Sequence, residues 1–114
     1  MSYDDNNIFA KILRKEIPCN KIYEDEFVLS FYDINPQKKI HALVIPKGKY
    51  VDLDDFSQNA SPEEMVGLLK GINTVAKKLN ISVDTGKGYR ALANISEDGG
   101  QEVPHLHFHL FGGE

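Results

Sequence analysis

Three of the four histidines in this sequence of 114 residues stand on alternate positions near its end, in the segment VPHLHFHLFGGE. They are His105, His107 and His109, and a large apolar residue separates each from the next. Alternate side chains of a β-strand point to the same face, so the spacing predicts a strand with three imidazoles on one face and apolar side chains on the other. A neutral imidazole is a nucleophile and carries protons, and a protonated one donates to phosphate oxygens. The pattern predicts a reactive face on which three imidazoles divide these tasks.

Zinc binding is the main alternative for these histidines, because two imidazoles at positions i and i+2 of a strand can both reach one zinc ion. His105 and His109 would lie ~13 Å apart along an extended strand that rises ~3.3 Å per residue. Since zinc–nitrogen bonds are only ~2 Å long, one zinc bound by all three would need a strongly bent strand. An adjacent pair remains a candidate zinc site.

The fourth histidine, His41, opens the apolar segment HALVIP. It is either a buried boundary residue or a partner that fixes the proton position on one of the other three. In the loop before them, the pair Gly99 and Gly100 allows the backbone to approach a ligand and present N–H groups to an anion. Asn94 and Gln101 add uncharged donors. Such donors indicate a phosphate ligand bound without a metal.

Two helices are expected to position these residues. Asn7 is a good N-cap for a short helix over residues 8–15. Ser61 is a good N-cap for a long helix, and Glu64 three positions later completes a capping box. Apolar residues then recur at helical spacing, which predicts one apolar face. That face comprises Met65, Leu68, Leu69, Ile72, Val75, Ala76 and Leu79.

Five strands are expected over residues 21–25, 26–33, 41–46, 88–94 and 105–111. The first two would form a hairpin through a tight acidic turn. Because the helices are segregated from the strands, the order predicts an α+β fold with a five-stranded, mainly antiparallel sheet, one short helix and one long helix. We find no repeat or linker, so residues 1–114 are expected to form a single domain.

Composition limits the classes of partner. The formal net charge is −4 and no dense Lys/Arg run is present, which argues against general binding to nucleic acid or an anionic membrane and favours a small ligand. The polar, acidic start is unlike a signal peptide, and no apolar run approaches membrane-spanning length, so a cytoplasmic protein is expected. The single cysteine, Cys19, excludes an intramolecular disulfide and is expected to be an inert thiol.

The segment GGQEVPHLHFHLFGG resembles the signature of the histidine triad (HIT) superfamily, in which three histidines alternate with apolar residues. The segments IFAKILRKEIP, FYDINPQ and HALVIP resemble, in order and spacing, those of its Hint branch, the nucleotide-binding phosphoramidases. The resemblance covers about residues 7–113. It implies a HIT-like fold, a single HIT domain over residues 1–114 and a homodimer. It also implies a metal-independent hydrolase, without cofactors, that cleaves purine nucleoside 5′-phosphoramidates through a nucleotidyl-histidine intermediate.

The resemblance also implies roles for individual residues. The central histidine of the family attacks the α-phosphorus, and His107 holds that position. By the same reading, His109 contacts the phosphate and protonates the leaving amine, while His105 and His41 orient the array. The implied nucleotide-binding residues are Asp33 at the ribose hydroxyls, Asn94 at the phosphate, Gly100, Gln101 and Val103 beside them, and Ile8, Phe9, Ile12, Phe31 and Ile34 around the base.

Simpler interpretations and departures from the family pattern remain. Asp33 is also a suitable turn-capping residue, and the five apolar residues are also suitable core residues. Glu102 stands where some relatives have a phosphate-binding serine, and an ionised carboxylate cannot donate; Pro104 has no N–H. Many relatives continue beyond Glu114 with a tail that borders the partner subunit's site. The alternatives in function are a dinucleoside polyphosphate hydrolase, a zinc-dependent hydrolase that uses a histidine pair, and a nucleotide-binding interaction module.

Overall fold

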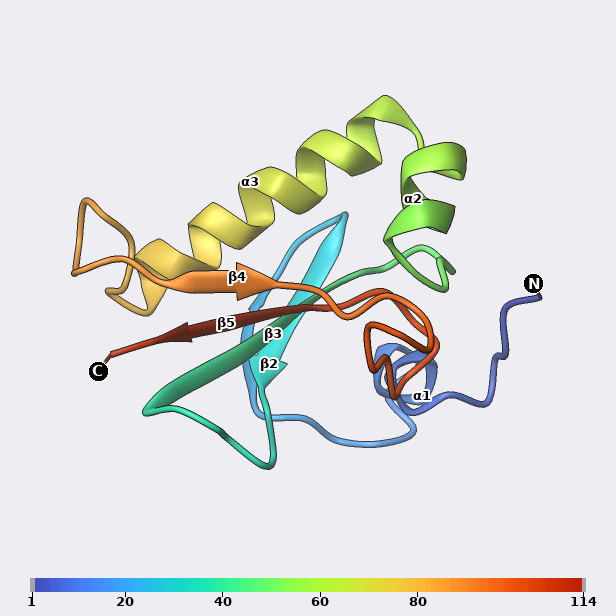
Figure 1. The fold of residues 1–114 in the computed structure, drawn as a ribbon, viewed down its shortest axis with the longest axis horizontal. Helices are drawn as coiled ribbons and strands as arrows, with labels where there is room; N and C mark the ends of the chain where they lie inside the picture. The colour runs from blue at the N-terminus through green and yellow to red at the C-terminus, as the bar shows by residue number, and fades with distance from the viewer. Residues whose placement is uncertain (1, 114) are drawn as a thin grey trace.

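A computed structural model describes residues 2–113, which form one sheet flanked by helices (Figure 1). Within this range the chain runs through α1 (Ile8–Leu13), β1 (Lys21–Glu24), β2 (Val28–Tyr32), β3 (Ile40–Pro46), α2 (Leu53–Asn59), α3 (Pro62–Lys78), β4 (Arg90–Leu92) and β5 (Phe108–Gly112). The five strands of the described chain lie in the order β1-β2-β3-β5-β4, and each neighbouring pair is antiparallel. The α+β class and the five-stranded antiparallel sheet are therefore confirmed.

The two faces of the sheet pack against different helices. Alternation along β2 and β3 sends Val28, Ala42 and Val44 into one cluster with buried residues of α3. It sends the residues between them, such as Leu43 and Ile45, into a second cluster with α1. Figure 1 shows α3 along one side of the sheet and α1 at the opposite side. The sheet is thus covered on both faces, which explains why β3 is apolar almost throughout.

The capping residues begin both helices as expected. The Asn7 side chain accepts a hydrogen bond from Ala10 N–H at 2.9 Å, and α1 begins at the next residue. The Ser61 hydroxyl accepts from Glu64 N–H, and the Glu64 carboxylate accepts from Ser61 N–H, so the capping box is present. Two details differ. Helix α1 ends before Lys15, which has a φ of 65°, and Leu69 on α3 is 68 % exposed rather than part of the packed apolar face.

Two short helices, rather than one, accompany α3 in the described residues. Helix α2 was not predicted, because it buries only Phe56 and therefore has almost no apolar period. Its start did carry a signal, since the Asp52 side chain caps the helix by accepting from Asp55 N–H.

The last two strands are shorter than predicted. Strand β4 occupies only Arg90–Leu92, and β5 begins at Phe108, so His105 and His107 precede the strand. The apolar side chains keep their predicted alternation all the same, since Leu106 and Leu110 are buried in the cluster beneath α3. The described residues include no helix long and apolar enough to span a bilayer.

Candidate active site

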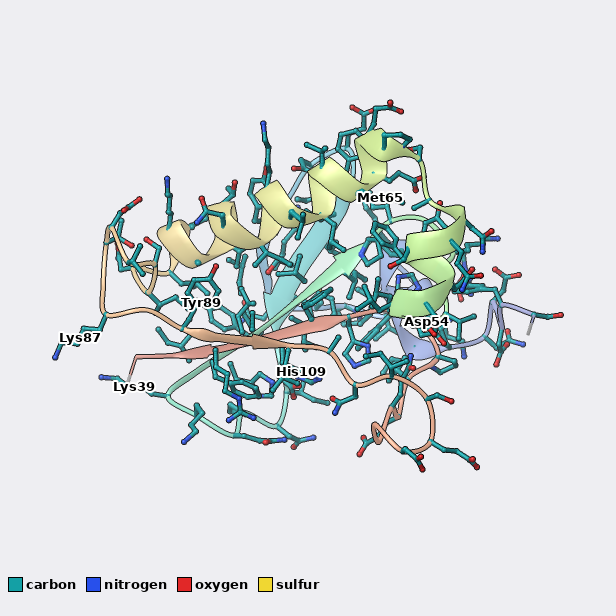
Figure 2. All side chains as sticks on the ribbon, turned by 45° about the horizontal axis from the view of Figure 1, so that its top comes forward. Lys39, Asp54, Met65, Lys87, Tyr89 and His109 are labelled. Atoms are coloured by element: carbon teal, nitrogen blue, oxygen red, sulfur yellow. The ribbon has the colours of Figure 1, made fainter. Side chains whose placement is uncertain are left out.

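Strand register places two histidines on the α1 side of the sheet. His109 of β5 pairs with Leu43 of β3, and His41 pairs with Phe111, so all four side chains point to that side. Figure 2 shows the labelled His109 on the side of the sheet away from Met65 of α3. The antiparallel pairing of β3 with β5 therefore brings together two residues that lie 68 positions apart in the sequence.

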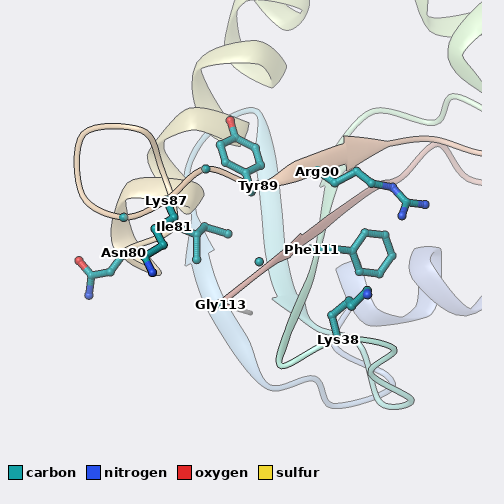
Figure 3. A pocket seen from close by; sticks show the side chains of 11 residues that line it. Lys38, Asn80, Ile81, Lys87, Tyr89, Arg90, Phe111 and Gly113 are labelled. Carbon is teal, nitrogen blue, oxygen red and sulfur yellow. The ribbon is translucent and has the colours of Figure 1, made fainter.

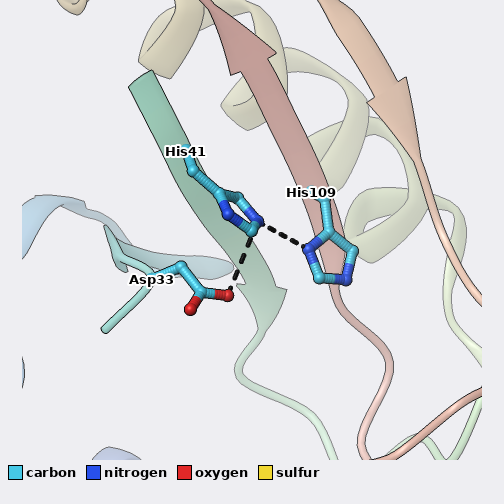
Figure 4. Close-up of side chains that lie close together, drawn as sticks. All are labelled: Asp33, His41 and His109. Atoms are coloured by element: carbon cyan, nitrogen blue, oxygen red, sulfur yellow. Dashed lines mark hydrogen bonds and ion pairs between the residues drawn. The ribbon is translucent and has the colours of Figure 1, made fainter. Parts of the chain in front are cut away.

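The proton positions of this pair follow from its hydrogen bonds. Gln37 N–H donates to His41 Nδ1 at 3.2 Å, so the neutral His41 ring carries its proton on Nε2. That nitrogen lies 2.9 Å from His109 Nδ1 and 3.5 Å from an Asp33 carboxylate oxygen, as Figure 4 shows. His41 therefore donates to His109, and the neutral His109 ring keeps its own proton on Nε2.

The other two histidines lie in the segment that leads into β5. The His105 ring is fully buried: its Nε2 lies 2.8 Å from Pro46 O, and its Nδ1 lies 2.5 Å from the Tyr3 hydroxyl. His107 Nδ1 lies 2.7 Å from the backbone oxygen of His105. A carbonyl oxygen only accepts, so His107 carries its proton on Nδ1 and has a free lone pair on Nε2. Of the three imidazoles expected to share one reactive face, His105 is enclosed within the protein, which leaves His107 and His109 as the rings that can meet a ligand.

Burial keeps all four rings neutral near pH 7. It lowers the pKa of His41 and of His107, against the opposing effect of the Asp33 carboxylate. Burial lowers the pKa of His105 to about 4. Burial, together with the neighbouring His107 and His41, lowers the pKa of His109 to about 4. Neutral imidazoles offer a lone pair at one nitrogen and a proton at the other, as nucleophilic and acid–base chemistry requires.

His107 and His109 open onto a cavity of about 230 Å³. Their ring centroids lie 5.1 Å apart, and the Phe9 ring stands edge-on to His107 at 4.9 Å. The cavity brings together seven of the sequence-predicted site residues, which are Phe9, Asp33, Asn94, Gly100, Val103, His107 and His109. Asn35, Gln37, Leu43 and Glu102 also line it and were not among the predicted site residues.

The remaining predicted residues do not line this cavity. His105 and His41 are buried behind it, and Ile12 and Phe31 belong to the cluster packed against α1. Ile8 is exposed, and Ile34 is 87 % exposed. Asn35 and Gln37 carried a detectable signal, since they follow Asp33 within the segment FYDINPQ, which resembles the Hint branch. Tyr3 carried no signal in the sequence, because 102 positions separate it from His105 and no local pattern links the two residues.

The glycine loop uses its donors for its own folding, contrary to expectation. Gly99 N–H donates to Ile95 O and Gly100 N–H donates to Glu97 O, so these groups are not directed at a ligand. A Cβ on Gly99 would lie 2.4 Å from Ile95 O, and Gly100 has a φ of 71°, so the loop needs glycine for conformation.

Gln101 is likewise used within the protein. Its Nε2 donates to Val51 O at 2.7 Å and to Val103 O at 3.0 Å, and its Oε1 accepts from Ser96 N–H. Asn94 donates one amide hydrogen to Gly99 O at 2.7 Å and keeps a second, so of these two amides only Asn94 has a donor to spare.

Asp33, His41 and His109 also form a candidate metal-binding group, because one ligand atom from each lies within 4.8 Å of the others. The zinc site expected from the sequence was an adjacent pair of the triad histidines, so this group of three is a different set of ligands. Zinc would need a lone pair on His41 Nε2, but that nitrogen is protonated because Nδ1 of the same ring accepts from Gln37 N–H. Binding would require that bond to break.

A larger cavity of about 600 Å³ lies at the far end of β5 (Figure 3). Its lining includes Tyr89, Arg90 and Phe111. The Phe111 ring also stacks against His109, with centroids 5.8 Å apart, and the Arg90 guanidinium lies 5.3 Å from its centre. Phe111 thus separates this cavity from the paired histidines.

Comparison with known proteins gives one consistent result. The family model described as HIT domain matches residues 14–114. An uncharacterised 13.2 kDa HIT-like protein from Azospirillum brasilense is 54 % identical over 112 residues, 98 % of this chain and 89 % of that protein. A solved structure named Hit Like Protein is 48 % identical, with a TM-score of 0.83 over 95 % of this chain and 99 % of its own. A HIT family hydrolase from Clostridium thermocellum is 38 % identical, with a TM-score of 0.86 over 97 % and 93 %.

Proposed function

This chain belongs to the HIT domain family, and on that premise we propose that it is a nucleotide-binding hydrolase that cleaves purine nucleoside 5′-phosphoramidates. The reaction takes place in the cavity that His107 and His109 line. One structural relative is named a HIT family hydrolase, which supports hydrolysis as the reaction class. The substrate class comes from the resemblance of the four sequence segments to the Hint branch.

The hydrogen bond from His107 Nδ1 to His105 O is the observation that carries this proposal. It leaves a lone pair on Nε2 of a ring that lines the cavity, with no proton to remove before attack. Burial lowers the pKa of His107, so the ring is already in its reactive neutral form at pH 7. A buried histidine with a purely structural role has no need of a free nitrogen beside a polar cavity.

The reaction divides into two steps that one water molecule balances. His107 Nε2 attacks the α-phosphorus and the phosphorus–nitrogen bond breaks, while the departing amine, which accepts a hydrogen bond from His109 Nε2–H, takes a proton from a water molecule. The resulting hydroxide attacks the nucleotidyl-histidine, and the bond between phosphorus and His107 breaks. The products are the amine and a nucleoside monophosphate, and the enzyme returns to its starting protonation.

Asp33 and the apolar wall are suited to the nucleoside. A carboxylate accepts hydrogen bonds from both ribose hydroxyls, and Asp33 is held in place because its Oδ1 accepts from Asn35 N–H at 2.8 Å. Phe9 packs edge-on against Phe31 with ring centroids 5.6 Å apart, and it provides an aromatic edge for the base. The spare amide hydrogen of Asn94 is suited to a phosphate oxygen. The resemblance also assigns Ile8, Ile12 and Ile34 to the base slot, although none of them lines this cavity.

A zinc-dependent hydrolase is the second candidate, favoured by the grouping of Asp33, His41 and His109. The two candidates differ in their need for metal. Under our proposal, hydrolysis persists after exhaustive chelation because imidazoles and fixed donors stabilise the phosphate charge. Complete loss of activity that added zinc restores would favour the second candidate. Dinucleoside polyphosphate hydrolysis remains the alternative within the superfamily.

We further propose that the protein is a cytoplasmic homodimer and that its ligand is a purine nucleotide. Strands β1 and β4 are the edges of the sheet, and pairing an edge with a second copy would satisfy its exposed backbone groups. Sedimentation that gives a concentration-independent mass of 12.8 kDa, the mass of one chain, would contradict the dimer.

A panel of substrates under single-turnover conditions tests the proposed activity. Adenosine and guanosine 5′-phosphoramidates should be consumed at rates that a dinucleoside polyphosphate of the same base does not reach. The Asp33→Asn variant should weaken binding of ribonucleosides more than that of their 2′,3′-dideoxy analogues, because only the former present the hydroxyls. Preference for the dinucleotide, or an equal effect on both nucleosides, would contradict the corresponding assignment.

A further inference from the structure

Tyr3 lies outside the segment that the family model matches, which begins at residue 14. Its hydroxyl nevertheless lies 2.5 Å from Nδ1 of His105, and the two rings meet edge-to-face with centroids 5.5 Å apart. The proposed mechanism assigns no role to this tyrosine. Its contact with the first histidine of the triad is therefore a feature of this chain that needs its own explanation.

The second hydrogen bond of the His105 ring decides the direction of the first. Pro46 O, 2.8 Å from His105 Nε2, accepts a proton, so that nitrogen is the donor. Nδ1 of the neutral ring is then an acceptor, and the Tyr3 hydroxyl donates to it. Because the His105 ring is fully buried, Tyr3 satisfies a lone pair that would otherwise have no partner.

His105 passes this constraint to the nucleophile through its backbone. Its carbonyl oxygen accepts the Nδ1 proton of His107 at 2.7 Å, which is the bond that leaves His107 Nε2 free. The ring of His105 is held from both sides, by Tyr3 and by Pro46 O. The backbone N–H of His105 donates to Val103 O at 2.8 Å. The position of the acceptor for His107 thus depends on how firmly residue 105 is held.

The segment that carries Tyr3 is anchored to the body of the protein. The Lys49 ammonium lies 2.8 Å from the Asp5 carboxylate, and Arg14 Nη1 donates to Asp5 O at 2.9 Å. The Asn7 amide donates to Asp4 O at 2.7 Å. These contacts already order the segment, so holding the Tyr3 phenol against His105 costs little additional conformational entropy.

We propose that Tyr3 is a positioning residue, which acts through His105 to hold the His107 ring in the tautomer and orientation needed for attack on phosphorus. Only the kinetic consequence of this inference rests on the proposed function. The hydrogen-bond relay from Tyr3 to His105 to His107 is a property of the protein without substrate. It is measured separately.

The imidazole ¹⁵N resonances of the full chain test the relay directly. A protonated ring nitrogen and one with a free lone pair resonate far apart, so the spectra report each tautomer. In the wild-type protein, His105 and His107 should carry their protons on Nε2 and Nδ1, respectively. In Tyr3→Phe, the His105 Nδ1 resonance should move toward that of an unbonded nitrogen, and His107 should become a mixture of tautomers. Unchanged His107 resonances in Tyr3→Phe would overturn the proposal.

Kinetics then separate positioning from binding. Tyr3→Phe should lower kcat roughly 10-fold, because small misplacements of a reacting group are costly, and leave KM within about twofold. Tyr23→Phe is the matched control: it also loses a tyrosine hydrogen bond to a side chain, the one to Asp25 at 2.7 Å in the β1–β2 hairpin. It should keep the wild-type kcat.

The two readouts distinguish failure of the inference from failure of the proposed function. A wild-type kcat in Tyr3→Phe would overturn the positioning role even if the His105 resonance moves. A wild-type protein that hydrolyses no phosphoramidate would instead overturn the proposed function, while the resonances would still decide whether Tyr3 holds the relay.

Discussion

His41 donates a hydrogen bond of 2.9 Å to His109 across strands β3 and β5, although the strand register pairs His41 with Phe111. The contact is a diagonal one, of the kind that long side chains make between neighbouring strands. Because Gln37 N–H occupies the other nitrogen of His41, the proton of His109 stays on Nε2. A backbone N–H of the loop before β3 thus determines which atom of His109 can donate a hydrogen bond to a substrate.

Replacing His109 by alanine should slow most the substrates that have an amine leaving group. The departing amine needs a hydrogen-bond donor while it takes up its proton from water, so His109→Ala should reduce turnover of adenosine 5′-phosphoramidate ~10²-fold or more. An adenylate ester of a nitrophenol, whose leaving group departs as an anion, should lose much less. Equal losses for the two substrates would show that His109 does not act on the leaving amine.

The acid side of the pH–rate profile should lie below the ordinary histidine range. Burial lowers the pKa of His107 from 6.5, and a ring with a lowered pKa stays neutral at pH values where a free imidazole is already protonated. As pH falls from 7.5 through 6.5, kcat/KM should therefore hold nearly constant and decline only at lower pH. A profile for the amidate substrate that already declines near pH 7 would contradict this reading of the site.

The stability of the fold should also depend on pH through His105. Its pKa is about 4 in the folded protein against 6.5 for the free side chain, so between these values the unfolded chain binds more protons. The stabilisation from the neutral buried ring is complete above pH 6.5 and is lost as pH falls toward 4, by roughly 3 kcal/mol. Urea unfolding of His105→Gln should show a shallower decrease over this range than the wild type. If the free energies of unfolding of the two proteins fell in parallel with pH, this role of His105 would be contradicted.

A side chain at the point where helix α3 packs on β2 should destabilise the fold. A Cβ on Gly71 would lie 2.8 Å from Val28 Cγ2 in the core, so the clash in Gly71→Ala opposes the gain in helix propensity. The gain is about 1 kcal/mol and overpacking costs about 1–3 kcal/mol, so we expect net destabilisation of about 1 kcal/mol. Asn73→Ala, at an exposed position of the same helix, should be neutral or slightly stabilising. Equal free energies of unfolding for the two variants would refute the packing argument.

The fold was predictable wherever local chemistry and the final structure agree. The capping box at Ser61 and the period of the following apolar residues determine α3 almost without context, and the alternation of Leu106 and Leu110 with the histidines correctly predicted which side faces the core. The start of β5 was not predictable in this way. Strand β3 continues to Pro46, but its pairing with β5 ends at Val44 and Phe108. The backbone before Phe108 bonds elsewhere, since His105 N–H donates to Val103 O and Leu106 N–H donates to Tyr50 O.

The site was predictable as a set of residues but not as a set of bonds. Periodicity selected the histidines, and resemblance added Asp33 and Asn94. Neither could assign the proton on any ring, since Gln37 N–H and the backbone oxygens of His105 and Pro46 make those assignments. The donors of Gly99 and Gln101 were assigned to a ligand because sequence shows only their capacity to bond, whereas the folded loop uses them internally.

The identity of the nucleophile is the central claim, and the mass of the intact protein early in the reaction tests it most directly. The wild-type enzyme, quenched in acid-free conditions after one turnover of adenosine 5′-phosphoramidate, should carry one adenylyl group on His107, and mild acid should remove it, as expected for a phosphorus–nitrogen bond to imidazole. His107→Ala should form no adduct, lose several orders of magnitude in turnover and still bind adenosine monophosphate, because Asp33 and the apolar wall remain. An adduct mapped to another residue, or near-wild-type turnover by His107→Ala, would contradict the account and assign the attack on phosphorus to another group or to water.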